Sequence, residues 1–445
     1  TDAAENTIPT LIPATSEAFA TYGVVDEAVV QPIDPPKDAI PEYGGLEVSL
    51  SSTALTGLQD AVTYLFDYPY ECTEQIASRI LPIIALGDII RDFKLGAADT
   101  PEKAKEMVKD GIKKLMRHQR SDGGFGYWPD SRDSWLYITA YAVMTLDLAS
   151  KAGFEVNQAA VEQALTFLKN RLDNPHEWEV WAYDAQVMAV LVLARQGKDP
   201  GSHLGRLFGL AKEDGRTMTE WKHDLALYSR AWLMEALWRR DPKDTRVDEL
   251  MRQLSNAAVE KASSIHFAEG IRESMRLMMH TEDRSDGIIL NSLVLVKPQD
   301  PMIPKVVRGL ARSRVHGRWS TTQANAWALL GMSAYYNAFE KETPNFKATL
   351  WMDKVPILGR QFKGRSMDIV KTKVPMKFML EQAAKDLILS KSGPGRLYYR
   401  LGLKYAPKNL NLAPEDRGFT VERVYYPEVG KEPLTKNADG AYVVK

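Results

Sequence analysis

The chain has 445 residues, of which 44% are hydrophobic, so it can bury at least one large core and exceeds a single small domain. Lys and Arg total 57 against 58 for Asp and Glu, without a long basic run, which excludes a surface built for nucleic acid or anionic lipid. No segment approaches the roughly 18 consecutive apolar residues of a membrane span. The single cysteine, Cys72, excludes an intramolecular disulfide and a multi-cysteine metal site.

Residues 1–51 form a mostly extended, proline-rich lead-in that ends in one strand. Residues 46–50 alternate between apolar and polar side chains, as a half-buried strand does. The first residue is threonine, not methionine, and residues 441–445 have the composition of a strand. We therefore expect the sequence to be part of a longer protein.

Residues 52–340 predict helices of two kinds. Some are amphipathic, such as the helix that carries Val247, Leu250, Met251 and Leu254 on one face. Others are apolar on nearly every side and must be surrounded by protein. These buried helices recur about every 40 to 60 residues, which is typical of helical hairpins that close into an α/α toroid. They are expected at residues 135–148, 181–194, 225–238, 288–296 and 326–335.

After residue 344 the hydrophobic period returns to two, which predicts strands. The simplest arrangement inserts the helical ring into a β domain, so that strands before residue 51 complete a sheet formed after residue 344. We predict a lead-in at 1–51, a toroid at 52–340, the remaining β domain at 341–407, and the start of another β domain at 408–445. The strands are expected at 348–352, 387–389, 397–405 and 419–426.

The lone cysteine lies three residues before Gln75, directly ahead of a helical stretch at residues 76–80. A cysteine at this spacing can condense with the glutamine side-chain amide, losing ammonia and leaving a thioester. Because a thiolate, with a parent pKa of about 8.5, leaves more easily than an amine, a thioester is a better acyl donor than an amide. The start of a helix adds backbone N–H groups and a positive dipole end.

The pattern of Cys72, Glu74 and Gln75 resembles the thioester signature of the complement and α2-macroglobulin family. The similarity to the bacterial branch of that family extends from about residue 8 to residue 430. It implies an α/α toroid inserted into a CUB-like β domain, followed by the start of a macroglobulin-like β domain, with no cofactor and no metal. The stretches that carry it are residues 44–48, 66–75, 119–128, 319–327 and 393–401.

The resemblance also suggests supporting residues around the thioester. Tyr68 either shields the bond from water or packs as an ordinary aromatic residue, and packing is the favoured interpretation for Tyr70. Glu74 either caps the backbone at the helix start, which we favour, or orients the glutamine amide. His176 is a candidate for relaying the acyl group to hydroxyl acceptors, or it is a solvated loop histidine. Without a relay, direct attack by lysine amines is expected.

By the same resemblance, the parent protein is a broad-spectrum protease inhibitor of the periplasm, with a membrane-anchored lipoprotein as one form. An attacking protease would cut a bait segment, and one of its lysines would attack the thioester in a single-turnover reaction that is not catalysis. Partners would be proteases and other domains of the same chain. One alternative is a covalent adhesion or opsonin-like module. Another is an isoprenoid-type enzyme, since residues 119–128 resemble the Gln-Trp repeat of terpenoid cyclases, although the acidic motif of those enzymes is absent.

Overall fold

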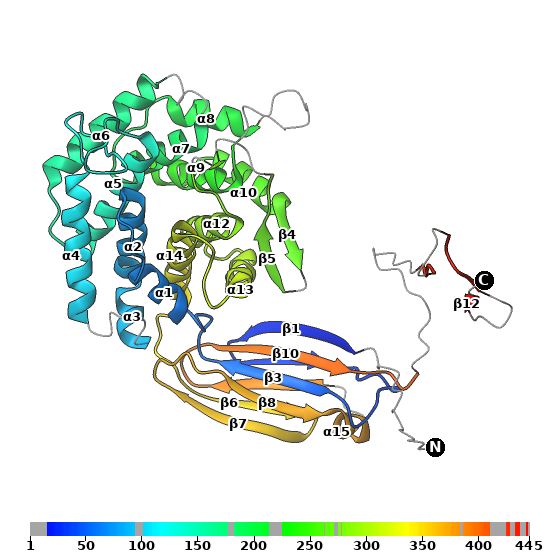
Figure 1. The fold of residues 1–445 in the computed structure, drawn as a ribbon. Helices are drawn as coiled ribbons and strands as arrows, with labels where there is room; N and C mark the ends of the chain where they lie inside the picture. The colour runs from blue at the N-terminus through cyan, green and yellow to red at the C-terminus, as the bar shows by residue number, and fades with distance from the viewer. Residues whose placement is uncertain are drawn as a thin grey trace, which may run out of the picture.

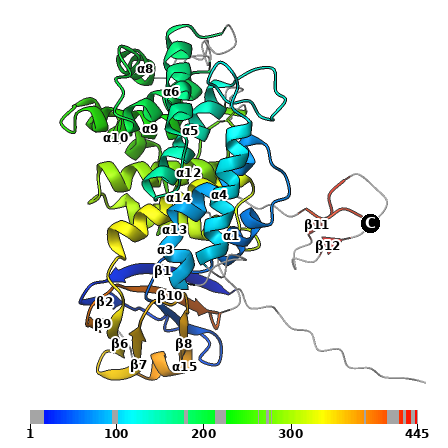
Figure 2. The same cartoon turned by 90° about the vertical axis from the view of Figure 1, so that its left-hand side faces the viewer.

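The protein consists of a ring of helices above a pair of β-sheets (Figure 1). The computed structural model describes residues 16–93, 101–176, 182–212, 225–261, 263–270, 275–276, 278–382, 386–409, 424–427, 432–436 and 442–443. In both views the sheet with β1 and β10 lies nearer to the helices than the sheet with β7 (Figures 1 and 2). This sheet therefore forms the boundary of the sandwich toward the ring.

The inner layer of the ring consists of helices that are buried on almost every side. Each contacts the next along the chain, and the last contacts the first, which closes the ring. An apolar helix must be surrounded by protein. In a closed ring, every inner helix has another inner helix on each side. The inner helices are α2 (Thr73–Ala85), α5 (Leu136–Lys151), α7 (Tyr183–Arg195), α9 (Leu227–Arg240), α12 (Glu282–Val296) and α14 (Thr322–Phe339).

Amphipathic helices form the outer layer and alternate with the inner ones along the chain. In α10 the buried residues are Val247, Leu250, Met251 and Leu254, so the predicted apolar stripe is confirmed. The two layers match the helix types that the sequence predicted. The outer helices are α4 (Pro101–Arg117), α6 (Gln158–Asp173), α8 (His203–Lys212), α10 (Arg246–Ala257) and α13 (Met302–Ser313), with the shorter α1 (Gln59–Phe66) and α3 (Gly87–Phe93) near the entry to the ring.

A short hairpin within the ring segment of the chain, between α10 and α12, was not predicted from the sequence. Strand β4 (Ala258–Lys261) pairs with β5 (Ser264–Phe267), and β5 packs against α13. The Phe267 backbone N–H donates to the buried carboxylate of Asp286, 2.8 Å away. A Cβ atom at Gly309 of α13 would collide with the carbonyl oxygen of Ile265. The absence of a side chain there allows the strand to approach the helix.

The β-sandwich is built from strands on both sides of the ring segment. One antiparallel sheet has the order β1 (Glu17–Val25), β10 (Leu397–Tyr405), β3 (Gly45–Ser51), β8 (Val370–Pro375). The other has the order β2 (Ala28–Pro32), β9 (Asp386–Ser392), β6 (Asn345–Met352), β7 (Val355–Lys363), and α15 (Met376–Glu381) follows β8. Their facing side chains share one apolar core. The CUB-like assignment and the exact domain boundaries remain predictions.

Some predicted elements fall partly outside the described residues. These are position 181, at the start of a predicted helix, and residues 419–423 of a predicted strand. Residues 424–426 are described and have no strand assignment. Near the end of the chain, β11 (Thr435–Lys436) pairs with β12 (Tyr442–Val443). Most of the segment 408–445 therefore stays a prediction.

Candidate functional site

Cys72 occupies the N-cap position of α2, so the helix begins at Thr73 and contains the helical stretch that the sequence predicted at residues 76–80. Its backbone is extended and its side chain is buried, with 6% exposure. The Gln75 side-chain oxygen accepts a hydrogen bond from the Cys72 backbone N–H at 3.0 Å. In return, the Cys72 side chain faces the Gln75 backbone N–H, which completes a reciprocal capping box. The helix start therefore brings the sulfur side of Cys72 and the amide of Gln75 together.

The environment of Cys72 keeps its sulfur protonated at neutral pH. Burial raises the pKa of the thiol, and the nearby Glu74 carboxylate adds to this increase. Hydrogen bonds from the Gln75 and Glu74 backbones act in the opposite direction but are outweighed. A helix start alone would favour a thiolate, so the burial is the deciding effect.

The segment before Cys72 is tied to α2 and α4 by cations. The Arg79 guanidinium donates to the carbonyl oxygens of Tyr68, at 2.9 Å, and Tyr70, at 3.1 Å. Arg79 and Lys114 also form ion pairs with Glu71, at 3.2 and 2.6 Å. The hydrogen bond from Lys114 is the main reason that the pKa of Glu71 is lowered. These contacts fix the chain as it enters Cys72.

Glu74 is buried and joins the first helix of the ring to the last. Its carboxylate accepts hydrogen bonds from the hydroxyls of Ser78, at 2.6 Å, and Thr322, at 2.9 Å. Burial raises the pKa of Glu74 in spite of these bonds. Within the described residues, its side chain bonds neither to the backbone N–H groups at the helix start nor to the Gln75 amide. The carboxylate bonds to Ser78 and to Thr322 of α14, and the capping role stays a prediction.

Two tyrosines before Cys72 form an edge-to-face series of rings. Tyr68 is half-buried, and its ring lies 5.5 Å from that of Tyr64 and 5.7 Å from that of Tyr70. Tyr70 nevertheless remains 62% exposed. Aromatic packing thus describes Tyr68 better than Tyr70. A shielding role for Tyr68 stays a prediction.

The sequence missed a loop that covers the start of α2. The Thr73 backbone N–H donates to the Tyr127 carbonyl at 2.9 Å, and the Thr73 hydroxyl donates to the carbonyl of Gly126. Because that hydroxyl has only one proton, it must accept from Nδ1 of His118, which lies 2.8 Å away. Burial lowers the pKa of His118, so this histidine is neutral with its proton on Nδ1. In the sequence, residues 119–128 indicate only family resemblances, and nothing in them predicts a contact with the start of α2.

A sequence model of the A-macroglobulin TED domain family matches residues 46–175, a span that includes Cys72, Gln75 and the covering loop. An α2-macroglobulin homolog of Nostoc sp. is 24% identical over 88% of this chain. Residues 46–175 thus match the A-macroglobulin TED domain family, and most of the chain is similar to a bacterial α2-macroglobulin homolog. Its fold resembles that of trypsin-activated α2-macroglobulin from Escherichia coli, with a TM-score of 0.64, 19% identity and coverage of 90% of this chain. Salmonella α2-macroglobulin reacted with methylamine gives a TM-score of 0.56, 20% identity and 91% coverage.

The α2-macroglobulin relatives are much longer than this chain. It spans 20% of the Nostoc protein, 26% of the E. coli structure and 24% of the Salmonella structure. The comparisons therefore show the fold of this part and a family match for residues 46–175.

The remaining site predictions concern a relay histidine and metal ligands. His176 lies in the exposed loop after α6, whereas the histidine placed at the start of α2 is His118. A relay role for His176 stays a prediction.

Across the described residues, no group of three or more His, Cys, Asp or Glu side chains is arranged to hold a metal ion. In the same residues, no helix is long and apolar enough to cross a membrane.

Proposed function

We propose that Cys72 and Gln75 form an internal thioester, and that the whole protein uses it to trap attacking proteases covalently. The observation that carries the proposal is the reciprocal capping box, in which each of the two side chains faces the backbone N–H of the other residue, so that both lie within one helical turn. Two groups held in this way react as an intramolecular pair, with the entropic advantage that such pairs have.

Formation of the bond is a balanced condensation. The Cys72 sulfur attacks the side-chain carbonyl carbon of Gln75, the carbon–nitrogen bond breaks, and the amide nitrogen leaves as ammonia with the thiol proton. The Gln75 oxygen already accepts the Cys72 backbone N–H, so this donor stabilises the negative charge that develops on the oxygen. The product retains that oxygen as the thioester carbonyl.

Capture is the reverse type of acyl transfer, with an external amine as nucleophile. A lysine amine of the protease attacks the same carbon, the carbon–sulfur bond breaks, and the sulfur leaves with the amine proton as a free thiol. Burial favours the protonated thiol, which makes the back reaction slow. The protease ends in a stable amide link, and the chain is consumed, so the reaction is inhibition and not catalysis.

Two solved structures of related proteins support this reaction. The Salmonella α2-macroglobulin structure is described as reacted with methylamine, and the E. coli one as activated by trypsin. An amine reagent and a protease are the two classes of molecule that the proposal requires. We propose the same classes for this chain.

Intact mass spectrometry of the native chain tests the thioester directly. We expect a mass about 17 Da below the encoded value, a gain of about 31 Da with methylamine, and one newly reactive thiol, since ammonia is lost and an amine is added. The variant Cys72→Ser is the matched control and should show neither change. An encoded mass with a free thiol from the start, in chain purified without amines, would contradict the proposal.

Trapping is tested in the whole protein with a protease whose lysines are intact or methylated. A conjugate that survives denaturation should form with the intact protease and not with the methylated one. Conjugation to cell-surface material without prior proteolysis would instead support an adhesion module. We also propose a periplasmic site of action, to be checked by fractionating cells that express the tagged whole protein.

A further inference from the structure

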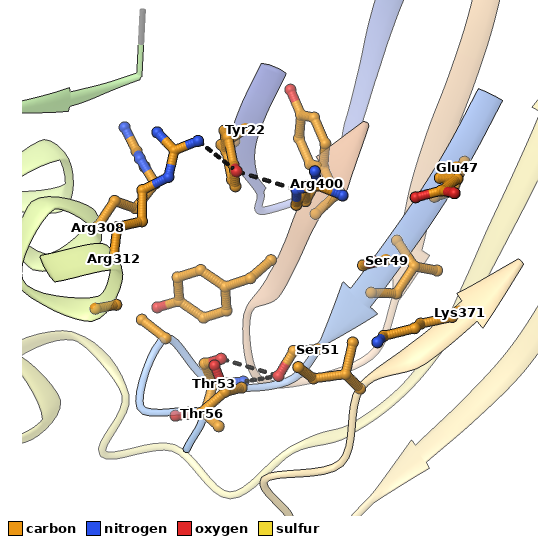
Figure 3. Close-up of a pocket in the computed structure, with 18 of the residues that line it drawn as sticks. Tyr22, Glu47, Ser49, Ser51, Thr53, Thr56, Arg308, Arg312, Lys371 and Arg400 are labelled. Carbon is orange, nitrogen blue, oxygen red and sulfur yellow. Dashed lines mark hydrogen bonds between the residues drawn. The ribbon is translucent and has the colours of Figure 1, made fainter. Parts of the chain in front are cut away.

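A cavity of about 740 Å³ lies between α13 and the outer face of the sheet that contains β1, β10, β3 and β8 (Figure 3). Its size is within the range of sites that bind ligands or peptide side chains. It is separate from the start of α2, and nothing in the proposed thioester chemistry uses it. Below we call it the α13 groove.

The strand register explains the sheet wall of the α13 groove. Tyr22, Arg400, Ser49 and Lys371 are direct partners across four neighbouring strands, so they form one row on one face. Because side chains alternate along a strand, the next row on that face begins two residues further along. That row contains Gly402 and the pair of Glu47 and Lys373, where the glycine leaves room above the sheet.

The helix wall comes from one face of α13. Val307, Arg308, Ala311 and Arg312 line the groove, at positions that a helix places on one side. Other α13 residues, including Ile303 and Leu310, are buried in the ring. The helix thus separates an apolar face toward the ring from a mixed basic and apolar face toward the sheet.

The α13 groove has an unbalanced positive charge. Five cations line it, and the only carboxylate among its lining residues is Glu47. None of the ion pairs in the described part of the chain involves any of these cations. The cations are Arg308, Arg312, Lys371, Lys373 and Arg400.

Tyr22 adds a hydrogen-bond donor to the groove. Its hydroxyl oxygen accepts from Arg312 at 2.7 Å and from Arg400 at 3.0 Å, as Figure 3 shows. Since both partners can only donate, the Tyr22 hydroxyl proton is available for another acceptor. Both guanidinium groups also lie against the tyrosine ring, at 4.5 and 5.8 Å from its centroid. The guanidinium groups of Arg312 and Arg400 and the Tyr22 hydroxyl are thereby held close together.

We propose that the α13 groove binds an extended acidic peptide segment of a partner protein. Guanidinium groups match carboxylates through paired hydrogen bonds, and three cations in two rows on the sheet with two more on α13 suit several carboxylates spaced along a chain. Ala311 and the 45% exposed Ile369 offer apolar contacts for the side chains in between, beside the buried Val307. An extended segment with alternating acidic and apolar residues satisfies both features.

The same features argue against the other polyanions. Nucleic acid bound as a single strand needs aromatic faces on which bases stack. The Tyr22 ring instead packs against two guanidinium groups. A small anion such as phosphate would leave the apolar wall and most of a 740 Å³ cavity unused. The acidic peptide is therefore the occupant that the groove fits best.

The test uses the full chain and a labelled, end-blocked peptide of about six residues that alternates glutamate and valine, in a fluorescence anisotropy titration at low salt. We expect saturable binding to the wild type and none for a peptide with glutamine in place of glutamate. The double variant Arg400→Gln with Lys371→Gln should weaken binding at least about tenfold, as loss of two charge-assisted contacts predicts.

Arg360→Gln with Lys347→Gln is the matched control, because it removes the same charge from exposed positions on β7 and β6 of the other sheet. Its affinity should stay within about twofold of the wild type. Lys371→Gln alone, at an exposed position, should weaken binding in the same direction and covers the case in which the double variant does not fold. Absent binding to the wild type, equal weakening in the control, or full displacement by inorganic phosphate at constant ionic strength would each overturn the proposal.

Discussion

Replacing Glu74 by glutamine should make the chain's stability less dependent on pH. Glutamine has the same shape and keeps one oxygen that can accept a hydrogen bond from Ser78 or Thr322, but it cannot ionise. Burial raises the pKa of Glu74, although both hydroxyls favour its charged form. The cost of burying the charge is therefore larger than the gain from those two hydrogen bonds.

The sign follows from proton linkage. A raised folded-state pKa means that the native state binds this proton more tightly than the unfolded chain does. The stabilisation is fully present below the unfolded pKa and is lost as the pH rises through the folded pKa. Each unit between the two pKa values changes the unfolding equilibrium by about tenfold. The raised pKa already includes the charge assistance that Ser78 and Thr322 give to the carboxylate, so the loss of that assistance in the variant does not reverse the sign.

Urea unfolding monitored by tryptophan fluorescence at pH 5, 6, 7 and 8 would measure this difference. The free energy of unfolding of Glu74→Gln, relative to the wild type, should rise steadily with pH. Glu106→Gln, at an exposed position of α4, is the control and should track the wild type at every pH. A Glu74→Gln difference that is constant or falls with pH would show that the carboxylate is not held at a raised pKa.

Three further changes test other parts of the structure. Glu235→Ala leaves a buried guanidinium of α7 without its carboxylate and should cost about 3 to 5 kcal/mol of unfolding free energy at pH 7, measured by denaturant titration. Gly111→Val forces a side chain into α2 and should destabilise by about 1 to 3 kcal/mol, whereas Gly87→Ala, in open space, should not destabilise. Arg79→Met removes the cation that holds residues 68–71, and their amides should exchange hydrogen at least about tenfold faster.

The helical periods in the sequence predicted the ring because they report burial, which is set by each helix's own side chains. Predicted buried stretches such as 225–238 and 326–335 correspond to α9 and α14 of the inner layer. The closure of α14 onto α2 could only be assumed, since it joins residues some 250 positions apart. The β4–β5 hairpin escaped notice because its strands are four residues long, too short to show a period.

The sequence predicted where strands occur better than it predicted which strands pair. Residues 397–405 alternate clearly and form β10, as predicted. The partners of β10, however, are β1 and β3, which lie on the other side of the whole ring segment. Register between such distant strands is fixed by the shared core and not by the local sequence. The α13 groove depends on that register, and therefore no motif in the sequence indicated it.

The candidate site also contains contacts that are local in the sequence and contacts that join distant residues. Cys72 and Gln75 could be identified from their spacing, because an N-cap and the residue three positions later meet in any helix start. The partners of Glu74 and Thr73 could not, since Thr322 is 248 residues away and His118 is 45 residues away. The sequence therefore predicted that Cys72 and Gln75 lie together but not the groups that orient the helix on which they lie.

Helix α14 links the candidate site to the junction with the sandwich. Near its N-terminus, Thr322 donates to Glu74, which lies within the Cys72–Gln75 turn. At its C-cap, the buried carboxylate of Glu340 accepts from the Thr53 hydroxyl at 2.5 Å and from the Ala54 backbone N–H at 2.9 Å, where the chain enters the ring. Burial raises the pKa of Glu340 as it does that of Glu74. One 18-residue helix thus carries a buried carboxylate contact at each end, so the orientation of α2 and the attachment of the ring to the sandwich depend on the same rigid element.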